Sequence, residues 1–263
     1  MIRTDATLRI ALGEYDIGWH DPHTSLDRAA ALADVALSAR ARLLVLPEMC
    51  TSGFTMDAGF AEPLEGESVQ RLSDIARSRH IWMIAGVPTS GLPGSSAARN
   101  SALVLDPDGN IAARYDKQKL FAYASEHESY EPGSAPVVID VEGLRIAPFI
   151  CYDLRFPEVF RAVAADVDAM VLIASWPAAR RSHWDALLPA RAIENQCYFI
   201  GVNRTGNGGR ITYDGGSAAY DPWGTRLVPD TNAAGGVPTV QISSAEVRRV
   251  RESYPFLADA TCP

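Results

Sequence analysis

Short apolar runs alternate with amphipathic stretches along this chain, and their spacing predicts its elements. Residues 8–12 and 43–46 are short apolar runs of the kind that forms buried strands. Between them, residues 24–41 carry apolar side chains at helical spacing, and Thr24 or Ser25 supplies a predicted N-cap. Strands that alternate with helices in this way predict an α/β or α+β protein.

The same arrangement of elements occurs twice, in the same order. The segment ARLLVLPEM resembles DAMVLIASWP, and SRHIWMIAGVP resembles ENQCYFIGVNR. NSALVLDPDGNIAARY resembles GGSAAYDPWGTRLVP, and the Asp-Pro-x-Gly turn in each predicts a hairpin. Two similar halves predict two sheets packed together and covered outside by helices. The alternative is that the similarity arises by chance, because segments of any α/β protein resemble one another to some extent. No linker rich in Pro, Gly and Ser separates the halves, so we expect one domain over residues 1–263.

Composition and charge exclude several classes of function. The chain has 263 residues, of which 47% are hydrophobic and 21% charged, with a formal net charge of −8. This acidic balance disfavours a nucleic-acid partner, which would need a basic face. The N-terminal stretch carries Asp5 and Glu14 among its apolar positions, unlike a signal peptide, and no apolar run is long enough to span a membrane. We therefore expect a cytoplasmic protein with no membrane partner.

The cysteines are expected to be free thiols, because the cytosol is reducing. They form no Cys-x-x-Cys pair, so the sequence predicts no metal site, and we expect no cofactor. The four cysteines are Cys50, Cys151, Cys197 and Cys262.

Three predicted strand ends carry reactive groups, and strand ends are where open α/β sheets bind ligands. Glu48 follows the run 43–46 and a proline, so its carboxylate emerges either at the rim of a buried strand or on a surface loop. Lys117 and Lys119 follow the second strand of the first predicted hairpin. They form either an oxyanion-stabilising site beside a cysteine or a solvated basic loop.

Cys151 is the third of these groups. It lies where a predicted strand, LRIAPFI, meets a predicted helix, FPEVFRAVAA, that has Pro157 in or near its first turn. A helix N-terminus favours a thiolate, and the N–H of Tyr152 is placed to face a developing oxyanion. A buried, inert cysteine explains the position equally well. The local sequence leaves both interpretations open.

Other candidates for a nucleophile or its base are less well placed. Cys197 has apolar neighbours that indicate burial in a strand, and Cys262 is the penultimate residue. Cys50, two residues from Glu48, remains a minor alternative. No histidine stands in a setting that singles it out as the base of a Cys–His pair. The histidines are His20, His23, His80, His127 and His183.

Taken together, the three strand ends make the chain resemble the nitrilase superfamily of carbon–nitrogen hydrolases over nearly its whole length. LPEMCTSGF is similar to that family's glutamate motif, YDKQKLF to its lysine motif and CYDLRFPE to its cysteine motif. This resemblance implies a catalytic triad of Glu48, Lys117 and Cys151. EHESYEPG is similar to a further glutamate motif, and its spacing to Pro-Gly points to Glu126 rather than Glu128. The resemblance also implies a four-layer α-β-β-α sandwich, and a homodimer or higher homo-oligomer that pairs through the helices around RAIENQ.

Within that superfamily the chain most resembles the omega-amidases, which hydrolyse the side-chain amide of 2-oxoglutaramate and 2-oxosuccinamate. The segments SWPAARRSHWDALLPARAIENQ and GVNRTGNGG carry this resemblance together with the three motifs. Two positions depart from the pattern. Cys50 stands where an aromatic residue is usual, which is expected to reshape the pocket floor. Lys119 stands where a histidine is common, so it competes with Lys117 for the role of triad lysine.

The chemistry that the resemblance implies is amide hydrolysis through a thioester on Cys151. Glu48 would serve as the base, first for the thiol and later for water. Lys117 and the N–H of Tyr152 would stabilise the tetrahedral oxyanion. Glu126 would orient Lys117 or assist proton transfer.

The substrate is expected to be a small amide, and Arg155 is the candidate for binding its carboxylate. The alternative is that Arg155 forms a structural ion pair with Glu158 or Asp153. Aromatic side chains are expected to wall the pocket or simply to pack in the core. They are Trp176, Phe54 and Phe121.

Two further functions remain open at this point. The same triad serves nitriles, N-carbamoyl amino acids and other amides in related enzymes of the superfamily. A function of a different class is a non-catalytic oligomeric scaffold, for which decayed triad positions would be expected, yet Glu, Lys and Cys are all present.

Overall fold

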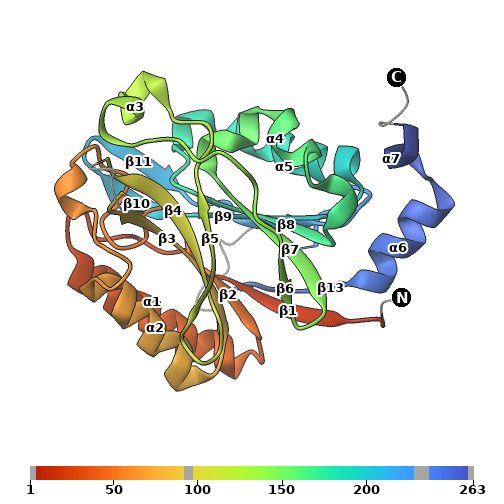
Figure 1. Cartoon of the computed structure of the whole chain (residues 1–263), viewed down its shortest axis with the longest axis horizontal. Coiled ribbons are helices and arrows are strands. Elements are labelled where there is room, and N and C mark those ends of the chain that lie inside the picture. Colours follow the sequence, from red (N-terminus) through yellow and green to blue (C-terminus); the bar gives the residue numbers. More distant parts are fainter. Residues whose placement is uncertain (1–3, 92–96, 228–236, 260–263) are drawn as a thin grey trace.

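The computed structural model describes residues 4–91, 97–227 and 237–259, which form two β-sheets packed face to face between helices (Figure 1). The first sheet has six strands and the second has five. The strands of the first sheet are β1 (Thr7–Leu12), β2 (Leu43–Val45), β3 (Trp82–Thr89), β4 (Arg99–Leu105), β5 (Ile111–Asp116) and β13 (Thr239–Ser243). Those of the second are β6 (Ile139–Val141), β7 (Leu144–Ile150), β8 (Ala169–Ala174), β9 (Tyr198–Asn203) and β12 (Ala218–Tyr220). A separate ribbon pairs β10 (Thr205–Gly208) with β11 (Ile211–Asp214).

Helices cover the outer face of each sheet, so the layers run α-β-β-α (Figure 1). α1 (Pro22–Ser38) and α2 (Glu67–Arg79) lie on the first sheet. α4 (Pro157–Arg161) and α5 (Arg181–Asn195) lie on the second. The remaining helices are α3 (Glu126–Ser129), α6 (Ser244–Ser253) and α7 (Phe256–Asp259). The 3₁₀ turns are η1 (Ala58–Phe60), η2 (Ala122–Ala124), η3 (Cys151–Arg155), η4 (Ala164–Asp166) and η5 (Ala178–Arg180).

Both sheets follow one plan, which confirms the two similar halves that the sequence predicts. The strand orders are β13-β1-β2-β3-β4-β5 and β12-β9-β8-β7-β6. Three adjacent strands are parallel in each sheet, β1, β2 and β3 in the first and β7, β8 and β9 in the second. β4 and β12 then pair antiparallel with β3 and β9. Because parallel strands end at the same edge of a sheet, the residues that follow β7 and β8 are neighbours. The facing sheet brings the residue after β2 against them, as the hydrogen bond from Ser175 N to Glu48 shows.

The prediction of the first helix is wrong at its N-terminus. α1 begins at Pro22, and Thr24 and Ser25 lie inside it rather than capping it. The cap is Asp21, whose carboxylate accepts a hydrogen bond from Thr24 N at 3.1 Å. Pro22 fits the first turn because the missing N–H would have no helical partner there.

The second predicted hairpin is only partly formed. Its first strand is β12, but the return strand is reduced to one antiparallel bridge between Tyr220 and Arg226. The last residues of the predicted segment, 228 and 229, lie outside the described residues.

Apolar side chains form two main cores. One lies between the sheets and continues under α4 and α5, and the other lies under α1 and α2. In β1, Ile10 and Leu12 belong to the core between the sheets, and Ala11 belongs to the core under the helices. Because both faces of the central strands are buried, these strands appear in the sequence as continuous apolar runs. Full burial of one such aliphatic side chain contributes about 1.5–3 kcal/mol.

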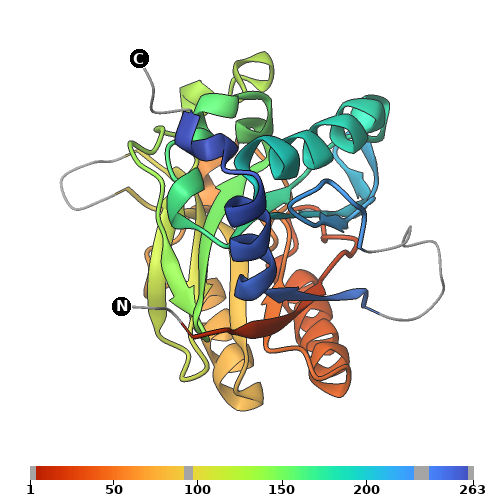
Figure 2. The same ribbon diagram turned by 90° about the vertical axis from the view of Figure 1, so that its right-hand side faces the viewer.

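The C-terminal segment connects the two halves. β13 pairs antiparallel with β1 of the first sheet, and α6 then runs toward the helices of the second half (Figure 2). There Arg251 donates hydrogen bonds to the carbonyl oxygens of Asn195 and Gln196, at 3.3 and 3.0 Å, where α5 ends. The single domain over residues 1–263 stays a prediction.

Two kinds of feature are absent from the described ranges. Among these residues no helix combines the length and the apolar character needed to cross a bilayer. The same residues contain no group of three or more His, Cys, Asp or Glu side chains arranged to hold a metal ion.

Candidate active site

Glu48 lies just beyond the carboxyl end of β2, and its side chain is fully buried. Gly86 of β3 permits this position, because a Cβ there would meet the Cα of Glu48 at 2.6 Å. One carboxylate oxygen accepts hydrogen bonds from Lys117 Nζ at 2.9 Å and Asn100 Nδ2 at 2.8 Å. The other accepts one from Ser175 N at 2.8 Å. These donors compensate for the burial of the carboxylate and hold it in one orientation.

Lys117 follows β5 and lies between two carboxylates. Its Nζ is 2.9 Å from Glu48 Oε1, and 3.0 and 2.9 Å from the two carboxylate oxygens of Glu126. Burial opposes the charge on Lys117, but Glu126 and Glu48 outweigh that effect and raise the pKa of its ammonium group. The Glu48–Lys117–Glu126 cluster therefore keeps its lysine protonated.

The competing lysine and glutamate lie outside this cluster. Lys119 is partly exposed, and its Nζ pairs with Glu158 at 3.1 Å. The side chain of Glu128 is exposed, whereas that of Glu126 is fully buried. The contacts thus join Lys117 to Glu126 and leave Lys119 and Glu128 apart.

Cys151 begins η3 directly after β7, with a φ of 44° that is uncommon for a residue other than glycine. This bend places the side chain on the wall of a cavity. Desolvation raises the pKa of the Cys151 thiol well above its usual value, and the charge of Glu48 raises it further while that of Lys117 opposes. The raised pKa means that the resting thiol is protonated, with the Glu48 carboxylate beside it as a proton acceptor. The expectation that a helix N-terminus favours the thiolate here is wrong, because burial and the neighbouring carboxylate outweigh it.

Asp153 anchors the turn that carries Cys151. One of its carboxylate oxygens accepts hydrogen bonds from Ile150 N at 3.0 Å and Tyr115 Oη at 2.7 Å. The other accepts one from Lys119 N at 2.9 Å. Burial raises the pKa of the Asp153 carboxyl to about 6. The carboxyl group thus ties the cysteine turn to the segment after β5.

The other described cysteines and the histidines do not line this cavity. Cys50 and Cys197 are buried, and burial raises the pKa of each thiol to about 12. Cys262 lies outside the described residues. All five histidines are within the described ranges, and none of them borders the cavity.

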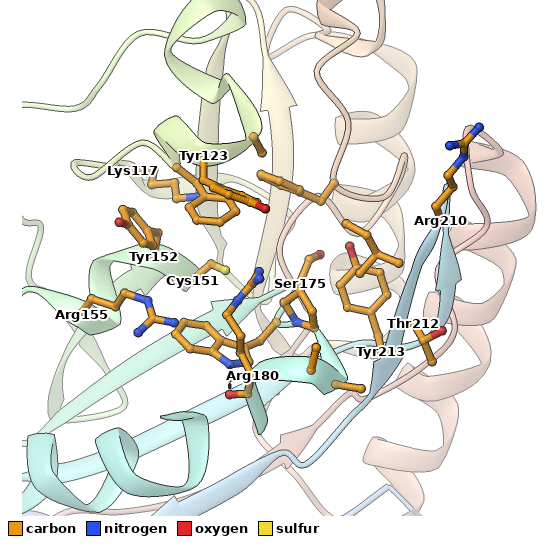
Figure 3. A pocket seen from close by; sticks show the side chains of 18 residues that line it. Lys117, Tyr123, Cys151, Tyr152, Arg155, Ser175, Arg180, Arg210, Thr212 and Tyr213 are labelled. Carbon is orange, nitrogen blue, oxygen red and sulfur yellow. Dashed lines mark hydrogen bonds between the residues drawn. The ribbon is translucent and has the colours of Figure 1, made fainter. Parts of the chain in front are cut away.

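The cavity has a volume of about 480 Å³, and Cys151 lies on its wall near Lys117 and Tyr152 (Figure 3). The ring of Phe54 lies 5.2 Å from Lys117 Nζ, and the ring centres of Phe121 and Tyr152 are 4.9 Å apart. The four side chains that the sequence predicts for substrate binding border the cavity, and Tyr152 does so too. The expectation that Cys50 reshapes the pocket floor is wrong, because Cys50 lies in the apolar core under α1 and α2 and does not border the cavity. The four predicted side chains are Phe54, Phe121, Arg155 and Trp176.

Arg155 has no carboxylate partner among the residues that the structure describes. Its guanidinium carbon lies 4.7 Å from the ring centre of Trp176, and its Nη2 is 3.2 Å from His183 Nδ1. The alternative of a structural ion pair is wrong, because Glu158 pairs with a lysine and Asp153 accepts hydrogen bonds from three other donors. The guanidinium of Arg155 therefore borders the cavity with no carboxylate of the described residues beside it.

Sequence reasoning missed two residues that contact the cluster. Asn100 Nδ2 donates hydrogen bonds to the carboxylates of both Glu48 and Glu126, at 2.8 Å from each. The backbone carbonyl oxygen of Asn100 accepts a hydrogen bond from Lys117 N at 2.9 Å. Ser175 follows β8 and donates its N–H to Glu48. The signal available was a polar residue at one end of each apolar run, in NSALVL and VLIAS.

A second missed group comes from the β10–β11 ribbon and the turn before α5. Arg210, Thr212 and Tyr213 border the cavity from the ribbon, and Arg180 borders it from η5 (Figure 3). No sequence signal marks these residues, because their approach to Cys151 depends on how the ribbon packs.

Comparisons with known proteins identify the family. A model of the carbon-nitrogen hydrolase family matches residues 9–252. Omega-amidase YafV of Escherichia coli (strain K12) is 39% identical over 220 residues, which cover 83% of this chain and 84% of that protein. The 2-oxoglutaramate amidase of Bacillus subtilis (strain 168) is 32% identical over 250 residues, covering 94% and 95%. The crystal structure of XC1258 from Xanthomonas campestris, a CN-hydrolase superfamily protein with an arsenic adduct in the active site, has a TM-score of 0.89 and 34% identity over 97% of both chains. The resemblance stated from the motifs is confirmed, and this chain belongs to the carbon-nitrogen hydrolase family.

Proposed function

We propose that this chain is an omega-amidase, which hydrolyses the terminal carboxamide of 2-oxoglutaramate or 2-oxosuccinamate to a carboxylate and ammonia. The observation that carries the proposal is the position of Cys151 on the wall of a cavity, beside the buried Glu48–Lys117–Glu126 cluster. The similarity to proteins named omega-amidase and 2-oxoglutaramate amidase supports this substrate class.

In the first step Cys151 Sγ attacks the amide carbon while Glu48 accepts the thiol proton. A carbon–sulfur bond forms, and the electrons of the C=O double bond move to the amide oxygen. The ammonium group of Lys117 and the N–H of Tyr152 stabilise the resulting oxyanion. Loss of one such donor typically lowers the rate by about 10²–10³-fold.

In the second step the carbon–nitrogen bond breaks, and Glu48 returns the proton to the departing amine, which leaves as ammonia. The acyl group remains on Cys151 as a thioester. Glu48 then accepts a proton from water, whose oxygen attacks the thioester carbon. The carbon–sulfur bond breaks, the sulfur recovers the proton from Glu48, and the carboxylic acid product is released. Glu126 and Asn100 position Lys117 and Glu48 throughout, through the contacts described above.

The charges around the cavity favour an anionic substrate. Lys117 is balanced by the two carboxylates of its cluster. Arg155, Arg180 and Arg210 also border the cavity, and none of them has a carboxylate partner among residues 4–91, 97–227 and 237–259. The carboxylate of a 2-oxo acid monoamide supplies the missing negative charge.

The test is ammonia release from 2-oxoglutaramate by the wild-type protein and by Cys151→Ala. We expect turnover by the wild type and none by the variant, with an unchanged circular dichroism spectrum, because the substitution removes only a sulfur atom at the cavity wall. Cys50→Ala serves as the control, because Cys50 is buried away from the cavity and should retain turnover. Wild-type-like ammonia release by Cys151→Ala would exclude the thioester route.

A panel of substrates separates this proposal from its alternatives. Faster ammonia release from a nitrile or an N-carbamoyl amino acid than from 2-oxoglutaramate would change the substrate class while keeping the triad. No release from any of them, with slow and uniform labelling of all cysteines by iodoacetamide, would favour the non-catalytic scaffold.

We also propose a homodimer or a higher homo-oligomer. An exposed apolar group near the end of α5 supports this proposal: the ring centres of Trp223 and Tyr254 are 4.8 Å apart, and their side chains are 42% and 45% exposed. Ile193, which is 51% exposed, packs beside the same turn at Gly224. Light scattering of the purified protein tests it, and a monomer at all concentrations contradicts it. The cytoplasmic location stays a prediction from the sequence.

A further inference from the structure

Two adjacent arginines, Arg180 and Arg181, have opposite surroundings. Arg181 pairs with Asp185 at 3.0 Å and with Asp214 at 3.1 Å, so its charge is neutralised by the protein. Arg180 borders the cavity and contacts no carboxylate in the part of the chain that the structure describes. The protein therefore leaves one of the two guanidinium groups available to a ligand.

The position of Arg180 is well defined by its neighbours. It ends η5 and precedes α5, and its carbonyl oxygen accepts a hydrogen bond from Trp176 Nε1 at 2.8 Å. Its guanidinium carbon lies 5.3 Å from the ring centre of Phe121. Figure 3 shows the side chain extending from the turn into the cavity, on the side where Cys151 and Ser175 are labelled.

Tyr213 borders the cavity and is affected by the charges of both Arg180 and the reacting groups. Burial is the main effect, and it raises the pKa of Tyr213. The positive charges of Arg204 and Arg180 lower this pKa, whereas Glu48 and Cys151 raise it further. The guanidinium of Arg180 and the Glu48–Cys151 pair therefore act on the same side chain, which borders the cavity.

We propose that Arg180, together with Arg155, binds the carboxylate of the substrate and so determines the preference for anionic over neutral amides. This inference rests on the proposed omega-amidase function. The two guanidinium groups border the same cavity, one against Phe121 and the other against Trp176. Arg155 is additionally held by His183, whereas Arg180 has all its side-chain donors free for a bidentate contact among the described residues.

The experiment compares Arg180→Met with its neighbour Arg181→Met on two substrates. The first is 2-oxoglutaramate, and the second is 4-oxopentanamide, which has the same amide and ketone but a methyl group in place of the carboxylate. For Arg180→Met we expect kcat/KM on 2-oxoglutaramate to fall about 10- to 100-fold, because hydrogen bonds to a charged group are lost. On 4-oxopentanamide we expect a change below about 3-fold, since no carboxylate is bound in that case. Arg181→Met should leave the ratio of the two kcat/KM values unchanged.

Further outcomes separate this inference from the function on which it rests. Arg180→Lys should recover part of the loss on 2-oxoglutaramate, because it restores the charge but not the bidentate geometry. Equal losses on both substrates, or no loss on 2-oxoglutaramate, would overturn the role of Arg180. If the wild-type protein itself fails to hydrolyse 2-oxoglutaramate, the proposed function fails first, whatever the variants do.

Discussion

The Glu48→Gln variant is expected to make Cys151 more reactive toward an alkylating reagent while abolishing amide hydrolysis. In the wild type, burial and the charge of Glu48 both keep the thiol protonated, against the opposing charge of Lys117. Glutamine has nearly the same shape but no charge and no ability to accept the thiol proton. The substitution therefore removes the base needed for turnover and the repulsion that disfavours the thiolate.

Coulomb's law gives the order of magnitude of this effect for two neighbouring charges. Two unit charges about 4 Å apart interact by about 4 kcal/mol at an effective dielectric constant of about 20. Even a third of that energy corresponds to a roughly tenfold larger thiolate fraction. We therefore expect alkylation of Cys151 at neutral pH to be at least about tenfold faster in Glu48→Gln. The amide of the new side chain would face Ser175 N–H, so we also expect a stability loss of about 1–3 kcal/mol.

The assay is the rate of iodoacetamide labelling at pH 7, followed by mass spectrometry of the peptide that contains Cys151. Cys50 and Cys197 provide internal standards, because both are buried with pKa values of about 12 and should label slowly in both proteins. Glu128→Gln is the matched control, since it removes an exposed carboxylate outside the cluster. It should change neither labelling nor turnover.

Two results would refute this reasoning. If folded Glu48→Gln labels at Cys151 no faster than the wild type, then Glu48 does not set the protonation of the thiol. If it hydrolyses 2-oxoglutaramate at a wild-type rate, then Glu48 is not the base. Thermal unfolding of both proteins ensures that the comparison is made on folded material.

Two further predictions concern the surroundings of the triad. Lys117→Met should lower turnover at least about 100-fold and destabilise the fold by about 3–5 kcal/mol, because it leaves buried carboxylates without a cation. Lys119→Met should cost at most about 1 kcal/mol, since its ion pair is partly exposed; ammonia release and urea unfolding measure both variants, and the reverse order would move the triad role to Lys119. Asp153 has a pKa of about 6 instead of 3.8, so between these pH values the folded protein holds a proton that the unfolded chain has lost. The stability of the wild type relative to Asp153→Asn should therefore fall as the pH rises from 4 to 7, by up to about 3 kcal/mol, and a constant or rising difference in urea unfolding would contradict this.

The strands that carry the triad could be predicted because their signals are local. Residues 43–46 form an apolar run that a proline ends, so the carboxylate two residues later had to emerge at a strand end. The same holds for Cys151 after its strand. The repeated order of elements also predicted two similar sheets, since each half must bury an apolar face against the other.

The protonation state and the contacts of the site residues could not be predicted from such local signals. A helix N-terminus next to Cys151 indicated a lowered thiol pKa, yet the structure raises it, because the largest effects are burial and a carboxylate about one hundred positions away in the chain. Asn100 was overlooked for a similar reason. It appears as one polar residue before an apolar run, and its contacts with Glu48 and Glu126 exist only when β4, α3 and the segment after β2 meet.

What the sequence determined by itself is therefore the set of elements, the duplicated plan and the chemical groups at the strand ends, because these depend on the spacing of neighbouring residues. What only the tertiary structure decided is which of the similar candidates enters the site. Lys117 and Lys119 are two residues apart, and Arg180 and Arg181 are adjacent, but in each pair one charge is neutralised away from the cavity and the other borders it. The two members of each pair differ in their ion-pair partner and in their burial. Both properties depend on residues brought together from distant parts of the chain.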